Sequence, residues 1–584
     1  MLLLAVGLAF AVPGLSMSLL DPDEGLYADV AREMVAAGDW VVPRFNGLPY
    51  LEKPPLYFWL TALAFLVTGF SEWVLRGWSV LAALGTSAVA WRLGRRLYGP
   101  RGGVVAGVML LTSAGYALYL RKASTDFVFA FSLALAVYGF IVDAERPDRG
   151  RRRFFLLYAG SALALLSKGL IGALFPALIV GVSLRWYPGL RWRDLNLTRG
   201  LTLVAALTVP WHALVAWRDP SLFRFYLVDN QILRFLNLRE FLEDDVAIST
   251  PGYLVATFLW FFPWSVFLLA RPAPTALVPA WRVTAVWAAV VVGFFALSGS
   301  KLEYYALPAL PAFAVLVAGG WTAGRDVGRW LGVGLAGCAT VGTAAIWLGP
   351  RMTPEQILGG LAHLNVYYRI LREQGAVLPF ESVRPFGLLL QGLGVTLLAG
   401  WVIAGVCWMR GWRRGALLAL VGVGAGIAAL IVELLILIEP HHSTRAVAEV
   451  ISGMAAPRDL VVHEGSLEYS AALPFYTGRR IRVVNGARGD LEFASRRPEA
   501  REYFLDAAAL AALWRGPDRV FLVTQQGRGR GVAATLPRES VRVVGRFGSR
   551  WLYASTPAHT WAGECGPTGG ACRAVLRGRT SPGG

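Results

Sequence analysis

The chain has 584 residues, of which 55% are hydrophobic and only 16% are charged. Soluble globular proteins carry about 25% charged residues, so this composition excludes that class, together with disordered and collagen-like chains. The 56 basic and 38 acidic residues give a formal net charge of +18. The composition predicts a polytopic membrane protein, in which basic residues gather in cytoplasmic loops. We therefore attribute the charge to topology and expect no nucleic-acid partner.

Thirteen apolar stretches predict transmembrane helices. They lie near 2–20, 74–92, 103–120, 125–142, 154–170, 171–184, 199–217, 251–270, 280–298, 304–320, 329–349, 384–408 and 415–438. Alternate loops contain clusters of Arg, whereas the loops 21–73, 218–250 and 350–383 are longer and rich in carboxylates. The positive-inside rule then places the N-terminus in the cytoplasm and these three loops outside. The short apolar run 56–70 would break this alternation, so we expect it to be re-entrant or interfacial.

The first ten residues contain no Lys or Arg and Pro13 follows them, which favours a first span over a cleaved signal peptide. Residues 1–438 are predicted to form a transmembrane domain with an outer juxtamembrane loop, 21–73. The pattern changes after about residue 439. Strands are predicted near 459–463, 480–484, 519–524 and 541–554, and a helix near 499–515.

These elements predict a small α/β domain, 439–556, outside the membrane. The Gly- and Pro-containing tail 557–584 is predicted to be disordered. It holds Cys565 and Cys572, which would pair only in an oxidising compartment. The sequence does not decide this.

Four charged motifs fall on the predicted outer side of the membrane. They are Asp21-Pro22-Asp23-Glu24, Glu52-Lys53-Pro54-Pro55, Arg121-Lys122-Ala123-Ser124-Thr125-Asp126 and Ser300-Lys301-Leu302-Glu303-Tyr304-Tyr305. An unpaired charge at the edge of a membrane helix costs a few kcal/mol. Such residues therefore pair, line a wet cavity or carry out chemistry, and a cluster on one leaflet predicts an active site at the outer face.

Lysine is rare in this chain, which has four Lys, Lys53, Lys122, Lys168 and Lys301, against 52 Arg. Lys is a compact point charge that binds phosphate without the fork of Arg. The four lysines are therefore candidates for binding an anionic head group. A predicted amphipathic helix, 25–37, would lie in the membrane interface and bring Asp23 and Lys53 to the depth of the lipid head groups.

Each of these motifs also has a simpler interpretation. Asp23 and Asp126 can each cap the helix that follows them. The Glu52-Lys53 pair can be an ordinary surface ion pair, and Lys168 can extend to the interface without a partner. The Tyr304-Tyr305 pair suits an interfacial aromatic belt as well as a substrate contact.

The order of the motifs resembles a known family. Asp23-Glu24-x-x-Tyr27-Ala28 is followed by Gly38-Asp39-Trp40, Glu52-Lys53-Pro54, Asp126, Ser167-Lys168-Gly169, Pro210-Trp211, Asn230 to Phe235 and Leu307-Pro308. Over about 1–320, the chain resembles bacterial membrane glycosyltransferases of the aminoarabinose transferase and protein O-mannosyltransferase type (family 39). The resemblance implies a GT-C fold. It also implies transfer of one sugar from a polyprenyl-phosphate carrier to an acceptor outside the cytoplasm, with inversion at C1.

The resemblance also implies roles for individual residues. By position in the motifs, Asp23 would be the catalytic carboxylate with Glu24 beside it, and Lys53 would contact the donor phosphate. Glu52 would be structural or linked to a metal, and Asp126 and Lys168 would line the cavity. The predicted catalytic residues are Asp23, Glu24 and Asp126. The predicted donor-phosphate and substrate-binding residues are Glu52, Lys53, Lys122, Lys168, Arg234, Lys301, Tyr304 and Tyr305.

The chain departs from the family pattern in one loop. Relatives of the aminoarabinose type often carry Glu-His before the Arg-Phe of the long outer loop, whereas this chain has Asp229-Asn230-Gln231-Ile232-Leu233-Arg234-Phe235. A metal site built on that His is therefore not expected in the same form. No cofactor is required by the predicted reaction, and a divalent metal is an open alternative.

The implied partners are a polyprenyl-phosphate-linked sugar donor, membrane lipids and an acceptor. The acceptor would be a lipid A-like glycolipid, a polysaccharide or a protein hydroxyl, and the sequence identifies neither it nor the sugar. The implied location is the bacterial inner membrane, with the active site and C-terminal domain on the periplasmic side. Two other functions use the same charges: a transporter or flippase of a lipid-linked or anionic substrate, and a non-catalytic lipid-phosphate binder. A transporter would show matching interrupted helices in two halves, and the sequence shows none.

Overall fold

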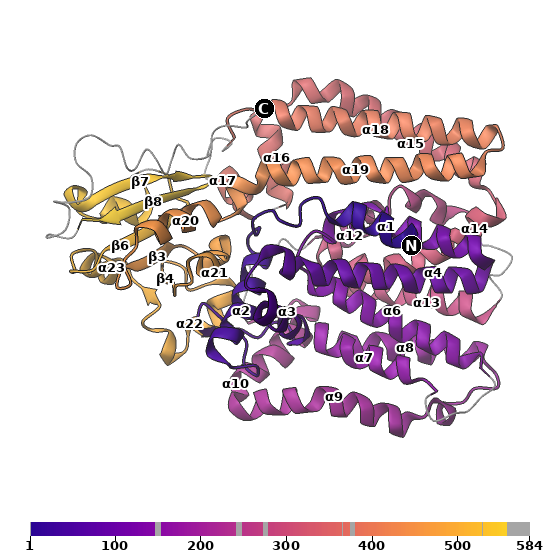
Figure 1. The fold of residues 1–584 in the computed structure, drawn as a ribbon, viewed down its shortest axis with the longest axis horizontal. Coiled ribbons are helices and arrows are strands. Elements are labelled where there is room, and N and C mark those ends of the chain that lie inside the picture. The colour runs from indigo at the N-terminus through magenta and orange to yellow at the C-terminus, as the bar shows by residue number, and fades with distance from the viewer. Residues whose placement is uncertain are drawn as a thin grey trace.

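The structure, a computed structural model, describes residues 2–146, 153–240, 248–271, 278–364, 366–373, 380–527 and 529–556. A bundle of helices occupies most of the molecule, and an α/β domain covers one end of it (Figure 1). The predicted disordered tail and both of its cysteines lie outside the described residues.

The helices of the bundle match the apolar stretches of the sequence. They are α1 (Leu2–Ala11), α4 (Glu72–Leu111), α5 (Ala114–Tyr119), α6 (Thr125–Ala144), α7 (Phe155–Lys168), α8 (Ile171–Ser183), α9 (Leu197–Arg218), α12 (Thr250–Trp260), α13 (Pro279–Leu297), α14 (Leu310–Ala323), α15 (Val327–Leu348), α18 (Arg384–Met409) and α19 (Arg413–His442). Outside these, the outer segments form α2 (Asp23–Ala37), β1 (Arg44–Phe45), β2 (Leu48–Pro49), α3 (Leu56–Thr68), α10 (Pro220–Arg224), α11 (Arg234–Leu236), α16 (Pro354–Leu364) and α17 (Val366–Glu373).

Eight helices in the described ranges are long and apolar enough to cross a membrane. The chain is therefore a polytopic helical membrane protein, while the number thirteen stays a prediction. The other predicted stretches hold shorter helices. α1 has only 10 residues where a span over 2–20 was expected. The run 56–70 forms the 13-residue α3, which is shorter than the roughly 20 residues that a span needs.

α4 covers two predicted spans because the chain reverses within it. Gly99 has φ 77° and Pro100 follows, and a left-handed residue ends a helix readily when it is Gly. The Ser87 hydroxyl donates to the Gly107 carbonyl over 3.2 Å, although 20 residues of straight helix would separate them by about 30 Å. The two halves therefore pack as a hairpin, as the stretches 74–92 and 103–120 predicted.

α2 forms where the amphipathic helix was predicted, but it is more deeply buried than an interfacial helix. Leu26, Val30 and Met34 are buried, as the predicted apolar face requires. Asp29 and Glu33 on the same helix are buried as well. The reason is that α2 packs both on α3 and on α21 (Leu473–Thr477) of the C-terminal domain.

The C-terminal domain is a six-stranded sheet in the order β5-β4-β3-β6-β8-β7. Its elements are α20 (Arg445–Met454), β3 (Leu460–Glu464), α21, β4 (Arg482–Val484), α22 (Glu492–Ser495), β5 (Phe504–Leu505), α23 (Ala507–Trp514), β6 (Val520–Thr524), β7 (Val541–Phe547) and β8 (Arg550–Ser555). β3 to β6 run parallel, and β8 pairs antiparallel with β6 and β7. A small mixed α/β domain is therefore present, as predicted.

The helix predicted over 499–515 is wrong in its first half. Phe504 and Leu505 form strand β5, which pairs with β4, and the helix begins only at Ala507. The Asp506 side chain accepts a hydrogen bond from the Ala509 N–H over 2.7 Å and caps that helix. An apolar pair next to a good N-cap fits either structure locally, and the sheet edge decides between them.

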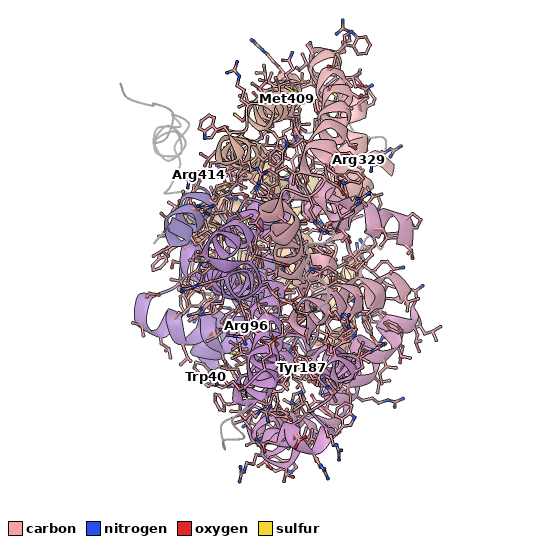
Figure 2. The ribbon with its side chains drawn as sticks, turned by 90° about the vertical axis from the view of Figure 1, so that its right-hand side faces the viewer. Trp40, Arg96, Tyr187, Arg329, Met409 and Arg414 are labelled. Atoms are coloured by element: carbon pink, nitrogen blue, oxygen red, sulfur yellow. The ribbon has the colours of Figure 1, made fainter. Side chains whose placement is uncertain are left out.

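Arginines mark the end of the bundle that lies away from the C-terminal domain. Figure 2 views this end and labels Arg96 of α4, Arg329 of α15 and Arg414 of α19 on it. These residues come from three of the Arg-rich loops that the positive-inside rule assigns to the cytoplasm. The predicted cytoplasmic loops that carry these three arginines therefore meet at one end of the fold.

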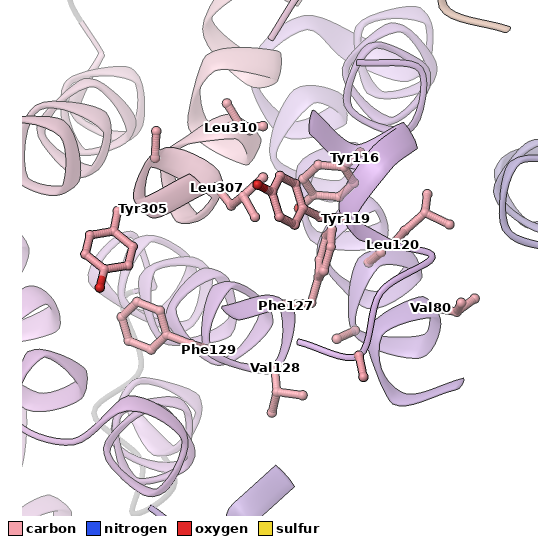
Figure 3. Packing of buried hydrophobic residues seen from close by; sticks show 14 of the residues in the cluster. Val80, Tyr116, Tyr119, Leu120, Phe127, Val128, Phe129, Tyr305, Leu307 and Leu310 are labelled. Carbon is pink, nitrogen blue, oxygen red and sulfur yellow. The ribbon is translucent and has the colours of Figure 1, made fainter. Parts of the chain in front are cut away.

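Aromatic packing fixes the other end of the bundle at the point where α5 leads into α6. The Tyr116 and Phe127 rings meet edge to face at 4.9 Å between centroids. Figure 3 shows Tyr116, Tyr119, Phe127 and Leu307 within the same buried cluster. This core holds the 120–126 connection, and with it Asp126, in a fixed position.

Candidate active site

The predicted site residues gather at the end of the bundle that the C-terminal domain covers (Figure 1). Asp23 begins α2, Glu52 and Lys53 precede α3, Asp126 lies in the first turn of α6, and Lys168 ends α7. Arg234 follows a π-helical segment, Phe225–Leu233, and Tyr305 lies in a short 3-10 helix, Glu303–Ala309. Residues far apart in sequence therefore meet in one region.

Five of the predicted residues line a common cavity. Its charged side chains are the cations Lys53, Lys168 and Arg234 and the carboxylate Glu52. The rest of the lining is aromatic, aliphatic and neutral polar: Ile171, Asn230, Gln231, Phe235, Phe294, Phe295, Ser298, Ser300 and Tyr305. Three cations against one carboxylate, set in an apolar wall, suit an anionic group attached to an apolar chain.

Lys168 is held in the cavity by a pair with Asp126. Its Nζ lies 2.5 Å from Asp126 Oδ1, and both side chains are nearly buried. The Lys168 ammonium also lies over the Tyr305 ring at 5.6 Å. The interpretation of Lys168 as an unpaired interfacial lysine is therefore wrong.

The sequence around Lys168 explains how α7 ends there. Gly169 has φ 78°, and a Cβ on it would lie 2.5 Å from Gln231 Oε1. That same oxygen accepts a hydrogen bond from the Leu170 N–H over 3.1 Å. Gly is required both by the backbone and by the contact, so the Ser167-Lys168-Gly169 motif couples the end of α7 to the π-helical segment.

Asp126 does not cap α6. The N-cap is Ser124, whose hydroxyl accepts from the Asp126 N–H over 3.1 Å. The Asp126 carboxylate is instead the partner of Lys168, which suits it to orient that lysine. A free general base would lack such a partner.

Glu52 belongs to a buried network that sequence reasoning missed in part. Its carboxylate lies 3.8 Å from Lys53 Nζ and 3.9 Å from an Arg239 nitrogen. Arg239 also pairs with Asp229 at 3.3 Å and donates to Asn230 Oδ1 at 2.8 Å. Glu52 is only 5% exposed, so the surface-pair interpretation is wrong and the network ties the Lys53 loop to the π-helical segment.

Asp23 has a different environment from the other carboxylates. It is half-buried, and within the described ranges its carboxylate has no hydrogen bond or ion pair, so it caps no helix there. It lies within electrostatic range of the Tyr119 hydroxyl, as do Asp126 and Glu303, and Tyr119 donates to Glu303 over 3.0 Å. Asp23 does not line the cavity, but a carboxylate without a partner among the described residues is available to an incoming substrate.

Glu24, although adjacent, is fully committed to the protein. Its oxygens accept from Arg76 Nη2 at 2.6 Å and Nε at 2.9 Å, and from the backbone N–H groups of Leu20 and Ala123 at 3.0 and 2.8 Å. Burial opposes its charge, but Arg76 and these hydrogen bonds outweigh that effect and lower the pKa of Glu24. The prediction of a catalytic role for Glu24 therefore finds no support in its geometry.

Three further predicted residues lie outside the cavity lining. The Lys122 ammonium lies over the Tyr119 ring at 5.7 Å. Lys301 is buried and donates to the Thr250 hydroxyl over 2.9 Å. The Tyr304 ring packs on Tyr119 and on Tyr305, with 5.4 and 5.3 Å between centroids. None of these three residues lines the cavity, and Tyr304 contacts its lining through Tyr305.

The described residues contain no group of three His, Cys, Asp or Glu side chains that converge as metal ligands. No metal ligand set is therefore assigned. The sequence analysis did not name Tyr119 or Arg239, and it named Asn230 and Gln231 only as part of a motif, without a role in the site. The π-helical geometry of Phe225–Leu233 is a common feature of functional sites, but residue types alone do not reveal it.

The fold and this site together define a membrane glycosyltransferase of the GT-C class. A family model described as dolichyl-phosphate-mannose-protein mannosyltransferase matches residues 52–215. The resemblance predicted from the motifs is confirmed over most of the chain by similar proteins and structures.

Among similar proteins is the undecaprenyl phosphate-alpha-4-amino-4-deoxy-L-arabinose arabinosyl transferase of Pseudomonas aeruginosa (strain UCBPP-PA14). It is 27% identical over 572 residues, which cover 93% of this chain and 96% of that protein. The transferase of the same name from Edwardsiella ictaluri (strain 93-146) is 30% identical over 329 residues, covering 53% of this chain and 57% of the relative. Among solved structures, ArnT from Cupriavidus metallidurans bound to undecaprenyl phosphate has a TM-score of 0.78 and 26% identity, covering 95% of this chain and 98% of that one.

Proposed function

We propose that this protein transfers one sugar from a polyprenyl-phosphate carrier to an acceptor outside the cytoplasm, with aminoarabinose on undecaprenyl phosphate and lipid A as the first donor and acceptor to test. The names of the similar proteins supply the sugar and the carrier. The observation that carries the proposal is the cavity in which Lys53, Lys168 and Arg234 meet beside aromatic side chains. A lipid-linked phosphate has the charge and the apolar chain that such a lining accommodates.

The cations have a clear role in the proposed reaction. An acceptor oxygen attacks C1 of the sugar on the face opposite the carrier, a new C1–O bond forms, and the C1–O bond to the carrier phosphate breaks. Its electron pair stays with the phosphate oxygen, so the carrier leaves with additional negative charge. Lys53, Lys168 and Arg234 would stabilise that charge from fixed positions in the cavity lining.

Asp23 would accept the proton of the acceptor O–H group as the new bond forms. Its free carboxylate and its place at the start of α2 support this role. Asp126 would orient Lys168, to which it is paired. Glu24 would hold the loop that carries Asp23, and Glu52 would hold the loop that carries Lys53, since each is bonded within a buried network.

We further propose that the site and the C-terminal domain face the periplasm. Arg96, Arg329 and Arg414 lie at the end of the bundle away from the C-terminal domain, and arginines favour the cytoplasmic side. A donor carried by a polyprenyl phosphate would then reach the cavity from the outer leaflet, where the acceptor is also found.

The experiment is transfer by the purified full-length protein in liposomes that contain undecaprenyl-phosphate aminoarabinose and lipid A. We expect lipid A of increased mass, detected by mass spectrometry, and release of undecaprenyl phosphate. If the donor instead crosses the bilayer of sealed liposomes unchanged and no acceptor is modified, the transporter function replaces this proposal.

A further inference from the structure

The loop that carries Asp23 is held by the C-terminal domain two residues earlier, at Asp21. Arg550, the first residue of β8, places Nη2 3.0 Å from Asp21 Oδ2, and the two side chains are 1% and 3% exposed. The other carboxylate oxygen, Oδ1, accepts from the Ala472 N–H over 2.7 Å. Both oxygens of Asp21 are therefore bonded to the C-terminal domain and not to the membrane bundle.

Arg550 joins this contact to the end of the last bundle helix. Its Nη1 donates to the Ser443 carbonyl over 3.0 Å and to the His441 carbonyl over 3.2 Å, just where α19 ends. Its Nε donates to the Ser470 hydroxyl over 2.9 Å. The buried Arg550 guanidinium thus connects the loop that carries Asp21, the end of α19 and the segment before α21.

A second contact fixes the first turn of α2 against the same domain. A Cβ on Gly25 would lie 2.2 Å from the Ala472 nitrogen and 2.6 Å from the Ala471 carbonyl carbon. Only a Gly allows the helix backbone to approach this closely. Glu24, between these positions, is bonded to Arg76 of the bundle, so Asp23 lies within a stretch that both domains hold.

The C-terminal domain uses its carboxyl sheet edge for this contact. In open parallel sheets, ligands bind outside the carboxyl ends of the strands where the strand order reverses. Here that point lies between β3 and β6, because β4 and β5 follow on one side of β3 and β6 on the other. Tyr469 and Gln525, which follow these two strands, line a small cavity with Asp21 and Arg550. The edge that would bind a ligand in such a domain binds the Asp21 loop instead.

We propose that Arg550 is a positioning residue for sugar transfer: by holding Asp21 it fixes the Asp23 carboxylate relative to the donor cavity. The C-terminal domain then completes the active site, in addition to any part it has in acceptor recognition. This inference rests on the proposed transfer function. Errors of about 1 Å in the placement of a reacting group cost about 100-fold in rate, so a loosened loop should be visible in kcat.

The test compares Arg550→Gln, Arg550→Lys and Gly25→Ala in the full-length protein in liposomes, with Arg546→Gln as the matched control on the same hairpin. Arg546 is exposed, and its guanidinium donates to the Gly548 carbonyl and lies over the Trp551 ring. We expect Arg550→Gln to lower kcat about 100-fold while the Kd for undecaprenyl phosphate changes less than twofold. Arg550→Lys should recover part of kcat, because it keeps a cation beside Asp21, and Arg546→Gln should match wild type.

Gly25→Ala supplies the same test without a change of charge, and it keeps the inference falsifiable if Arg550→Gln fails to fold. Hydrogen exchange should also rise at residues 19–26 in both variants and stay unchanged at 52–58. Wild-type kcat in both variants, or an equal loss of kcat and donor binding, would overturn this inference alone. A wild-type protein that transfers no sugar would overturn the proposed function as well.

Discussion

Replacing Arg76 with Met would remove the cation that neutralises Glu24 in the interior. The Arg76 and Glu24 side chains are 2% and 0% exposed and are joined by two hydrogen bonds, of 2.6 and 2.9 Å. Arg76 also donates to the backbone carbonyls of Leu15, Met17 and Ser18 over 2.9, 2.5 and 3.0 Å. With the Gly14 carbonyl, which accepts from Arg76 over 3.3 Å, the substitution would therefore leave a buried carboxylate and four carbonyls without this donor.

The expected cost is large because one partner of a buried pair remains charged. Breaking such a pair costs about 3–5 kcal/mol of folding free energy. The matched control is Arg96→Met, which breaks an ion pair with Glu145 whose side chains are 40% and 27% exposed. Exposed pairs contribute at most about 1 kcal/mol, so Arg76→Met should lower the unfolding free energy several times as much as Arg96→Met.

The assay is reversible unfolding in mixed micelles, monitored by tryptophan fluorescence, for wild type and both variants. The double variant Arg76→Met/Glu24→Gln should be more stable than Arg76→Met alone, since it leaves no unpaired charge. Equal losses of unfolding free energy for Arg76→Met and Arg96→Met would show that burial of the Arg76–Glu24 pair does not increase the cost of breaking it. A double variant no more stable than Arg76→Met would show that lost packing, and not the buried charge, sets the cost.

Three further predictions follow from the same geometry. Lys53→Met should weaken undecaprenyl phosphate binding at least tenfold in a lipid-binding assay, while Lys122→Met leaves it unchanged, because of these two lysines Lys53 alone lines the cavity. Equal effects of the two substitutions would show that the cavity is not the phosphate-binding site. Lys168→Met should lower kcat more than Asp126→Asn, because in the proposed reaction the Lys168 ammonium would contact the leaving phosphate, whereas Asp126 would only orient Lys168. The reverse order in steady-state kinetics would contradict this. Burial lowers the pKa of the His463 imidazole in the folded protein to about 4, whereas its pKa in the unfolded chain is about 6.5. Above about pH 6.5 the neutral ring contributes its full stability to the fold. About 3 kcal/mol of unfolding free energy is lost as the pH falls from there through 4, because the unfolded chain then binds a proton that the folded protein does not. His463→Phe should flatten that part of the stability profile between pH 7 and pH 4, and parallel profiles would exclude His463 as the titrating group.

Local patterns in the sequence predicted the parts of the fold that depend on local physics. Apolar stretches gave the bundle helices, and alternating apolar residues gave β3, β4, β6 and the β7–β8 hairpin. Phe504 and Leu505 were assigned to a helix because their pairing with β4 is not a local property. The span count depends on lengths that tertiary packing sets, such as the reversal at Gly99.

The candidate site was predictable where charge stood out against an apolar background. Lys53, Lys168 and Arg234 line the cavity; the two lysines were predicted from the charged motifs and the rarity of Lys, and Arg234 from the motif shared with the family. Arg76 was not singled out, since one arginine within an apolar stretch gives no sign of its partner 52 residues away. Arg550 pairs with a residue 529 positions distant, and no sequence pattern signals a contact of that range.

The most direct test of the account is sugar transfer by Asp23→Asn, measured beside donor binding in the same liposome preparation. Asparagine keeps the size of the side chain but cannot take a proton. We expect the rate of sugar transfer to fall by about 10²–10⁴-fold, while undecaprenyl phosphate still binds as it does to wild type. Transfer at the wild-type rate would contradict the assignment of Asp23 as the proton acceptor, and with it the proposed mechanism.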